Sequence, residues 1–107
     1  MQLNPYRDLP WEQLMPTARR KLLCSDKDYM FVLMECKAGT AQPPHSHPHT
    51  QITYIVSGRY RFTIGDETRE VGPGDTLLKQ NGVMHGCVCL EGGVMLDFFT
   101  PMREDFV

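Results

Sequence analysis

Three histidines and one glutamine are the residues whose types and spacing suit a metal site. His45, His47 and Gln51 stand together in one segment, and His85 follows much later in the chain. Neutral imidazole nitrogens are common ligands for divalent transition metals, and residues two positions apart on an extended strand point to one face. A neighbouring pair of ligands and a distant third therefore predict a metal site assembled from two β-strands of a closed sheet.

The C-terminal segment offers side chains for acid–base chemistry and for anion binding. Asp97 stands between apolar residues of a predicted strand, where a carboxylate is costly unless it has a purpose. Gln51 cannot accept a proton as a carboxylate does, so a general base has to come from elsewhere, and Asp97 is our candidate. Phe99 shares a strand face with Asp97. Arg103, just beyond Pro101, has the geometry of a bidentate carboxylate clamp if the chain folds back.

Several of these assignments have a structural alternative. Asp97 also fits an inert buried acid paired with an arginine, and Arg103 also fits a solvated tail. His49 has the strand parity of His47, so it is either a fourth imidazole ligand or a residue beside the site, and Pro48 argues against the ligand role.

The four cysteines are interpreted as free thiols rather than disulfides. Cys24, Cys36, Cys87 and Cys89 make an even number, but they lie in apolar contexts, and a cytosolic chain keeps its thiols reduced. Cys87 and Cys89 have strand parity with His85 and could approach a metal. The simpler interpretation of both is a small buried hydrophobic side chain.

Short β-strands separated by turn residues have to position these groups. Period-two alternation and Gly or Pro punctuation predict the strands, and Gly65-Asp66 predicts a hairpin turn. The predicted strands span residues 29–34, 51–56, 59–64, 67–71, 75–79, 85–90 and 94–100. Residues 1–16 are proline-rich and predict an extended arm with one short turn near residues 10–14. Many short strands predict an all-β sandwich or barrel.

Length and charge limit the class of protein and its partners. A chain of 107 residues predicts one domain, with residues 1–16 as the arm and 17–107 as the barrel. The formal net charge of −2 gives no electrostatic reason to expect binding to nucleic acid or to an anionic membrane. We find no apolar run that could span a bilayer and no secretion signal, so we expect a cytoplasmic protein.

The spacing of these residues resembles the two sequence motifs of the cupin superfamily. The first motif corresponds to the segment from Gly39 to Gly58, and the second to the segment from Gly74 to His85. The resemblance implies a single-domain cupin, which is a small jelly-roll β-barrel with a metal inside.

Three positions depart from the usual cupin pattern. Gln51 stands where the family usually has Glu, Cys89 where it usually has Asn, and Gln80 where it usually has Pro. A neutral amide in place of a carboxylate leaves the full charge on a divalent ion, which makes the ion a stronger Lewis acid and a stronger attractor of anions.

One cupin subgroup matches further features of the chain. The His-Ser-His-Pro-His run, Gln51 and the Asp-x-Phe-x-x-x-Arg ending look like the pectin-degradation (KdgF-type) cupins, which linearise 4,5-unsaturated uronates to the 5-keto-4-deoxyuronate. This resemblance implies one divalent transition metal (nickel, zinc, iron, cobalt or manganese), a small anionic sugar substrate and a homodimer. By the same resemblance the metal ligands are His45, His47, Gln51 and His85, and the active-site residues are Asp97, Phe99 and Arg103.

Two other functions fit a cupin of this kind. Cupins with three histidines also act as iron dioxygenases, although the loss of a carboxylate ligand at Gln51 weighs against that chemistry. A barrel of this type also serves as a non-enzymatic binding pocket for a small molecule. Oxygen uptake and metal content distinguish these alternatives.

Overall fold

Ten β-strands and one short 3-10 turn form the protein, in a computed structural model that describes residues 1–104. The 3-10 turn covers Tyr6–Asp8. No helix within residues 1–104 has the length and apolar character needed to cross a membrane. The strands are β1 (Glu12–Met15), β2 (Ala18–Ser25), β3 (Met30–Cys36), β4 (Ala41–His45), β5 (Thr50–Ile55), β6 (Arg59–Ile64), β7 (Glu67–Val71), β8 (Thr76–Lys79), β9 (His85–Glu91) and β10 (Gly93–Thr100).

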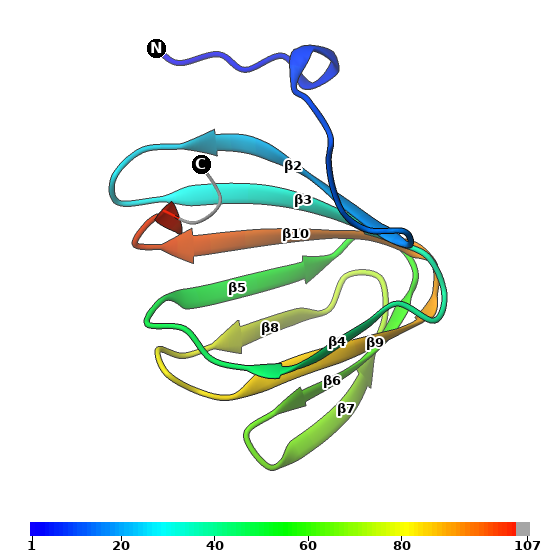
Figure 1. The fold of residues 1–107 in the computed structure, drawn as a ribbon. Helices are drawn as coiled ribbons and strands as arrows, with labels where there is room; N and C mark the ends of the chain where they lie inside the picture. Colours follow the sequence, from blue (N-terminus) through cyan, green and yellow to red (C-terminus); the bar gives the residue numbers. More distant parts are fainter. Residues whose placement is uncertain (105–107) are drawn as a thin grey trace.

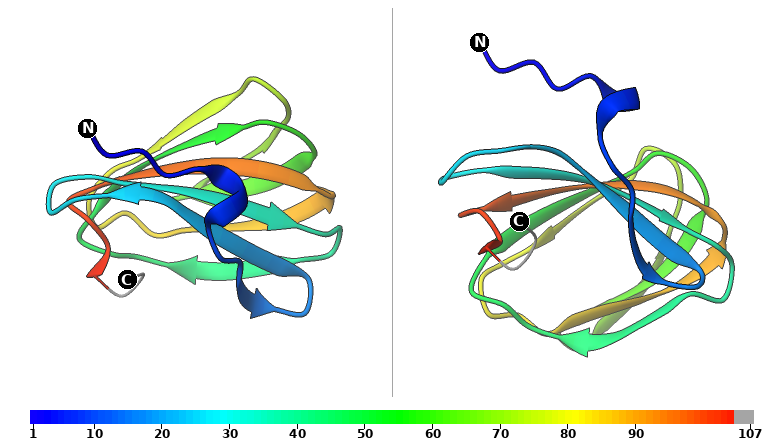
Figure 2. Two further views of the ribbon diagram at one scale, coloured as in Figure 1. Left: turned by 90° about the horizontal axis from the view of Figure 1, so that it is seen from above. Right: turned by 45° about the horizontal axis from the view of Figure 1, so that its top comes forward.

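The strands form two antiparallel sheets that face each other (Figure 1). One sheet has the order β1-β2-β3-β10-β5-β8, and the other has the order β4-β9-β6-β7. The views in Figure 2 show the same two layers with the N-terminal arm leading away from the outer side of β2 and β3. The arrangement confirms the all-β barrel expected from the sequence.

The inner face of the larger sheet changes from apolar to polar along its central strands. On β5 the buried residues are Gln51, Thr53 and Ile55, which alternate with partly exposed neighbours because successive side chains point to opposite faces. On the adjacent β10, Met95 pairs with Ile55, Asp97 with Thr53, and Phe99 with Gln51. The chain therefore places Asp97 and Phe99 beside the polar residues of β5 and leaves the apolar pairs to form the core.

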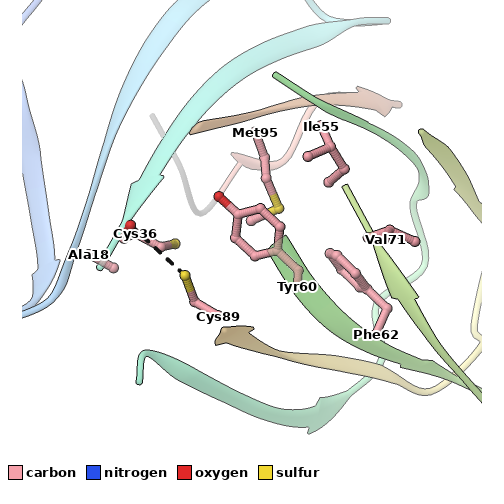
Figure 3. Packing of buried hydrophobic residues seen from close by; sticks show 8 residues of the cluster. All are labelled: Ala18, Cys36, Ile55, Tyr60, Phe62, Val71, Cys89 and Met95. Atoms are coloured by element: carbon pink, nitrogen blue, oxygen red, sulfur yellow. Dashed lines mark hydrogen bonds between the residues drawn. The ribbon is translucent and has the colours of Figure 1, made fainter. Parts of the chain in front are cut away.

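The main hydrophobic core fills the other end of the space between the sheets (Figure 3). Tyr60 and Ile55 are fully buried there, and the Tyr60 hydroxyl donates a hydrogen bond of 3.2 Å to the Ser57 carbonyl oxygen. The cluster consists of Ala18, Cys36, Ile55, Tyr60, Phe62, Val71, Cys89 and Met95. Burial of this apolar surface holds the two sheets together, since each large side chain contributes about 1.5–3 kcal/mol.

The N-terminal arm packs on the chain's own outer surface. Strand β1 pairs with β2, and the Lys21 ammonium donates a 2.8 Å hydrogen bond to the Tyr6 carbonyl oxygen. The Arg19 guanidinium lies 3.8 Å from the centre of the Trp11 ring. These contacts explain why part of a proline-rich segment is ordered against the barrel.

Most strands agree with the sequence prediction, and three were not predicted. The strands at Arg59–Ile64 and Glu67–Val71 have the expected bounds. Strands β8, β9 and β10 differ by one residue at one end, β5 differs by one residue at each end, and β3 begins one residue later and ends two residues later than expected. Strands β1, β2 and β4 were not predicted. The turn expected near residues 10–14 was misplaced, because the structure has its 3-10 turn at Tyr6–Asp8.

Candidate metal centre and catalytic cavity

Three imidazole rings meet between the two sheets. His45 ends β4 and His85 begins β9, and these two residues are paired across the strands, while His47 lies in the loop before β5. One ring nitrogen from each histidine lies within 4.8 Å of the others. The centres of the His45 and His85 rings are 4.5 Å apart, and those of His47 and His85 are 4.9 Å apart. The cluster has the compactness that a single ion requires.

Backbone carbonyl groups orient these rings. The Nδ1 atoms of His45 and His85 lie 3.1 Å from the carbonyl oxygens of Pro43 and Val83, so each ring carries its proton on Nδ1. A neutral imidazole then keeps its Nε2 lone pair for a ligand, which is the usual arrangement of metal-binding histidines. We assign His47 the same form, because its Nδ1 is closer to the His49 carbonyl oxygen, at 3.1 Å, than to the His49 backbone nitrogen, at 3.3 Å.

The amide of Gln51 completes the donor set. Its Nε2 donates a 2.9 Å hydrogen bond to Oδ1 of Asp97, which fixes the orientation of the amide and turns Oε1 toward His47. Oε1 then lies 3.2 Å from Nε2 of His47. Both atoms are acceptors when His47 carries its proton on Nδ1, so a cation between them would satisfy both lone pairs. The donor set therefore fits a divalent transition metal.

Burial keeps two of the histidines neutral. It lowers the pKa of His85 from its ordinary value of 6.5 to about 4, with a further lowering from the Lys79 ammonium. Burial and then Arg103 also lower the pKa of His47. Neutral rings are the form that binds metals, so both ligands are ready near neutral pH without losing a proton.

The carboxylate of Asp97 is held next to this cluster. Asp97 is 6% exposed, and its Oδ1 accepts hydrogen bonds from Thr53 Oγ1 at 2.6 Å and from Gln51 Nε2 at 2.9 Å. Thr53 is fully buried. The acid and the candidate metal ligand Gln51 are thus joined by one hydrogen bond, and the inert ion pair considered for Asp97 is not seen within residues 1–104, where no arginine forms a salt bridge with it.

Phe99 is the strand partner of Gln51 on β10, and Arg103 lies against the Phe99 ring. The Phe99 ring is 3% exposed, with its centre 5.8 Å from that of His47. The Arg103 guanidinium lies 5.5 Å from the centre of the Phe99 ring, so the chain beyond β10 does fold back toward the site. The geometry places both residues close to the histidine cluster, and their role as active-site residues stays a prediction.

A cavity adjoins the histidine cluster, and its walls include a residue that the sequence prediction omitted. Lys79 ends β8 and is 3% exposed, whereas its neighbour Leu78 is 56% exposed. Strand parity gave a signal for it, since Lys79 falls on the inward side of β8 with Leu77. Besides three thiols and several apolar side chains, the lining of the cavity includes His45, Gln51, Lys79, Asp97, Phe99 and Arg103.

His49 and the cysteines lie outside the histidine cluster. His49 is not part of the group of close ligand atoms, and its buried Nδ1 has no hydrogen-bond partner among residues 1–104. All four cysteines are free. Burial raises the pKa of Cys87 to about 11 and also raises that of Cys89, so neither thiol becomes the thiolate that binds metals near neutral pH.

Comparison with known proteins places this geometry among proteins of one family. The sequence model of the cupin domain matches residues 32–99. The pectin degradation protein KdgF of Dickeya dadantii is 36% identical over 102 residues, which cover 94% of this chain and 93% of that protein.

Two solved structures superimpose on almost the whole chain. KdgF from Halomonas sp. has a TM-score of 0.94 and 30% identity, covering 99% of this chain and 100% of that one. An RmlC-like cupin from Shewanella frigidimarina has a TM-score of 0.95 and 28% identity, covering 100% and 96%.

Proposed function

Since this chain belongs to the cupin family and within it is similar to the KdgF proteins, we propose that it is a metal-dependent enzyme of pectin or alginate breakdown. Its reaction is the linearisation of 4,5-unsaturated uronate monosaccharides to the 5-keto-4-deoxyuronate. The observation that carries the proposal is the hydrogen bond between Gln51 and Asp97, which sets a buried acid directly beside a candidate metal ligand.

A divalent metal fits the donor set described above. His45, His47, His85 and Gln51 would hold it, and the metal could be nickel, zinc, iron, cobalt or manganese, because these ligands suit all of them. When bound, it supplies Lewis-acid stabilisation of negative charge on a substrate oxygen.

Asp97 has the position and surroundings of a proton shuttle. The substrate is a ring hemiacetal whose ring oxygen is also part of an enol ether beside a carboxylate. Asp97 takes the proton of the anomeric hydroxyl, the bond from carbon 1 to the ring oxygen breaks, and an aldehyde forms. The ring oxygen leaves with the electron pair of that bond as an enolate. Return of the proton to carbon 4 gives the 5-ketone, so the reaction is an isomerisation that needs no other reactant.

The neighbours of Asp97 suit this role. The Gln51 amide is neither acidic nor basic near neutral pH, so it does not compete with Asp97 in proton transfer. Donation from Thr53 and Gln51 fixes the direction of the carboxylate. The Phe99 ring forms an apolar wall for the sugar, and Arg103 holds substrate oxygen atoms beside it.

Loss of the ultraviolet absorbance of the unsaturated uronate tests the proposal, measured in air and under nitrogen after subtraction of the spontaneous reaction. We expect acceleration under both gases and a fall in turnover of about 10²- to 10⁴-fold in Asp97→Asn, the usual size of an acid–base contribution. Oxygen uptake would indicate a dioxygenase instead. A fully metallated protein without acceleration and without oxygen uptake would point to a binding protein.

We also propose that the protein is a cytoplasmic homodimer. Its free cysteines agree with a reducing compartment. The outer face of β5 and β8 carries the exposed apolar residues Ile52, Tyr54 and Leu78, which a second copy would cover. Light scattering of the wild type and of Tyr54→Lys tests the dimer, and a monomeric wild type would refute it.

A further inference from the structure

Strand β8 buries a charged side chain and exposes an apolar one, which is the opposite of what solvation favours. Lys79 is 3% exposed, although a charged ammonium prefers water, and the adjacent Leu78 is 56% exposed. A register shift of one residue would exchange the two faces. Burial of a charge without a partner is strongly unfavourable, so a lysine that stays buried usually has a charged or polar group to meet.

The protein itself supplies little compensation for this ammonium. Among residues 1–104, Lys79 forms no salt bridge and donates no side-chain hydrogen bond, and its Nζ lies 4.5 Å from the centre of the Phe62 ring. A cation over an aromatic face is stabilised by only about 0.5–2 kcal/mol. Burial lowers the pKa of Lys79, and the Asp97 carboxylate acts in the opposite direction.

The position of Lys79 makes it part of the cavity wall. Its strand partner is Gln51, and Gln51 pairs on its other side with Phe99, so Phe99, Gln51 and Lys79 form one row across the sheet. Lys79 and Phe99 thus stand on opposite sides of a candidate metal ligand, and both line the cavity. Arg103 lies over Phe99, so the cavity has one cation on each side of Gln51.

We propose that Lys79 is a substrate-binding residue whose ammonium receives the carboxylate of the sugar acid. The assignment rests on the proposed function, in which the ring form of the substrate carries one formal charge, on its carboxylate. Of the two cations, Lys79 is the buried one, so a permanent anion gains most by meeting it in a site from which water is excluded. Arg103 then contacts the substrate on the Phe99 side.

Lys79→Met tests this inference, because methionine keeps the length and apolar stem and removes the charge. The probe is galacturonate, a saturated uronate that cannot undergo the reaction, titrated calorimetrically into the metal-loaded protein. We expect its affinity to fall by about 10- to 100-fold, as for loss of a hydrogen bond to a charged group. In turnover of the unsaturated uronate, KM rises by a similar factor while kcat stays within about threefold.

Lys21→Met is the matched control. Lys21 is also buried, at 4% exposure, but its ammonium donates to the Tyr6 carbonyl oxygen outside the cavity. We expect this variant to lose stability and to keep wild-type affinity for galacturonate. Lys79→Met should keep one metal per chain and unfold at a temperature no lower than the wild type, because an apolar group replaces a buried charge.

The outcomes separate this inference from the proposed reaction. Galacturonate binding that is unchanged within twofold in Lys79→Met overturns the inference even if the wild type opens the ring. Loss of metal or of folded structure in the variant also overturns it, because Lys79 would then be structural. A wild type that binds galacturonate through Lys79 but does not accelerate ring opening would support the inference and refute the reaction.

Discussion

Replacing Gln51 with glutamate tests whether the Gln51 amide nitrogen faces Asp97, because the substitution changes only that one group. The amide Nε2 that donates to Asp97 becomes a carboxylate oxygen at the same place, 2.9 Å from Oδ1. Two full charges at that distance repel by about 6 kcal/mol at an effective dielectric constant of about 20. The alternative is that the pair keeps one proton.

Keeping the proton is the less unfavourable outcome near neutral pH. A glutamate in the unfolded chain has a pKa of about 4.3, and each unit of pH above it corresponds to about 1.36 kcal/mol. Holding the proton at pH 7 therefore costs about 4 kcal/mol, which is less than the repulsion of two charges. We expect the metal-free Gln51→Glu protein to be less stable than the wild type by about this amount at pH 7.

The loss of stability in Gln51→Glu should depend on pH. The pair has a pKa that is raised on folding, so its full stability is present below about pH 4.3 and is lost as the pH rises toward the raised value. Urea unfolding of the metal-free proteins between pH 4 and pH 8 measures this, and the deficit should almost vanish at the acid end. Gln80→Glu, which adds the same charge at an exposed position, should show no such trend.

A Gln51→Glu protein with wild-type stability at pH 7 would refute the reasoning. It would mean that the amide nitrogen does not face Asp97, and that the orientation of Oε1 toward His47 is also wrong.

Three further predictions concern the same site. Thr53→Val removes the 2.6 Å hydrogen bond to Asp97, so urea unfolding should show a loss of about 1.5–3 kcal/mol, and restored stability in Thr53→Ser would identify the hydroxyl as the cause. Because the pKa of His85 is about 4 in the folded protein and 6.5 ordinarily, the metal-free protein should lose stability as the pH falls from about 6.5 toward 4. A metal at 100 times its dissociation constant should add about 2.7 kcal/mol at pH 7, as followed by thermal unfolding, and His85→Ala should abolish this gain.

Part of the arrangement of the candidate site could be predicted from strand periodicity, while the roles of its residues stay predictions. Parity put Asp97 on the same face as Phe99, as the structure has it. His47 lies in the loop after β4 rather than on the strand, and its ring still joins those of His45 and His85. The three-histidine cluster agrees with the predicted metal site, while the identity of the metal stays a prediction.

Strand β2 and the buried position of Lys79 were not predicted. Strand β2 contains three successive basic residues, Arg19, Arg20 and Lys21, and a shift of register between Leu22 and Cys24, which hide its alternation. The N-terminal arm covers outer residues of β2, and no local sequence pattern indicates this contact. Lys79 was overlooked because a lysine is usually assigned to the surface, although its strand parity with Leu77 was a signal for the inward side of β8.

His45 and Asp97 belong to strands that we expect to differ in how easily they unfold locally. Strand β4, which carries His45, lies at the edge of its sheet, has a shift of register between Gln42 and His45, and contains two prolines that lack a backbone N–H. Strand β10, which carries Asp97, lies between β3 and β5. We therefore expect the end of β4 to open locally more easily than β10, without disturbing the centre of the larger sheet. Metal exchange would then be a local event at the barrel edge, and an apoprotein would keep its acid in place, ready for the next ion.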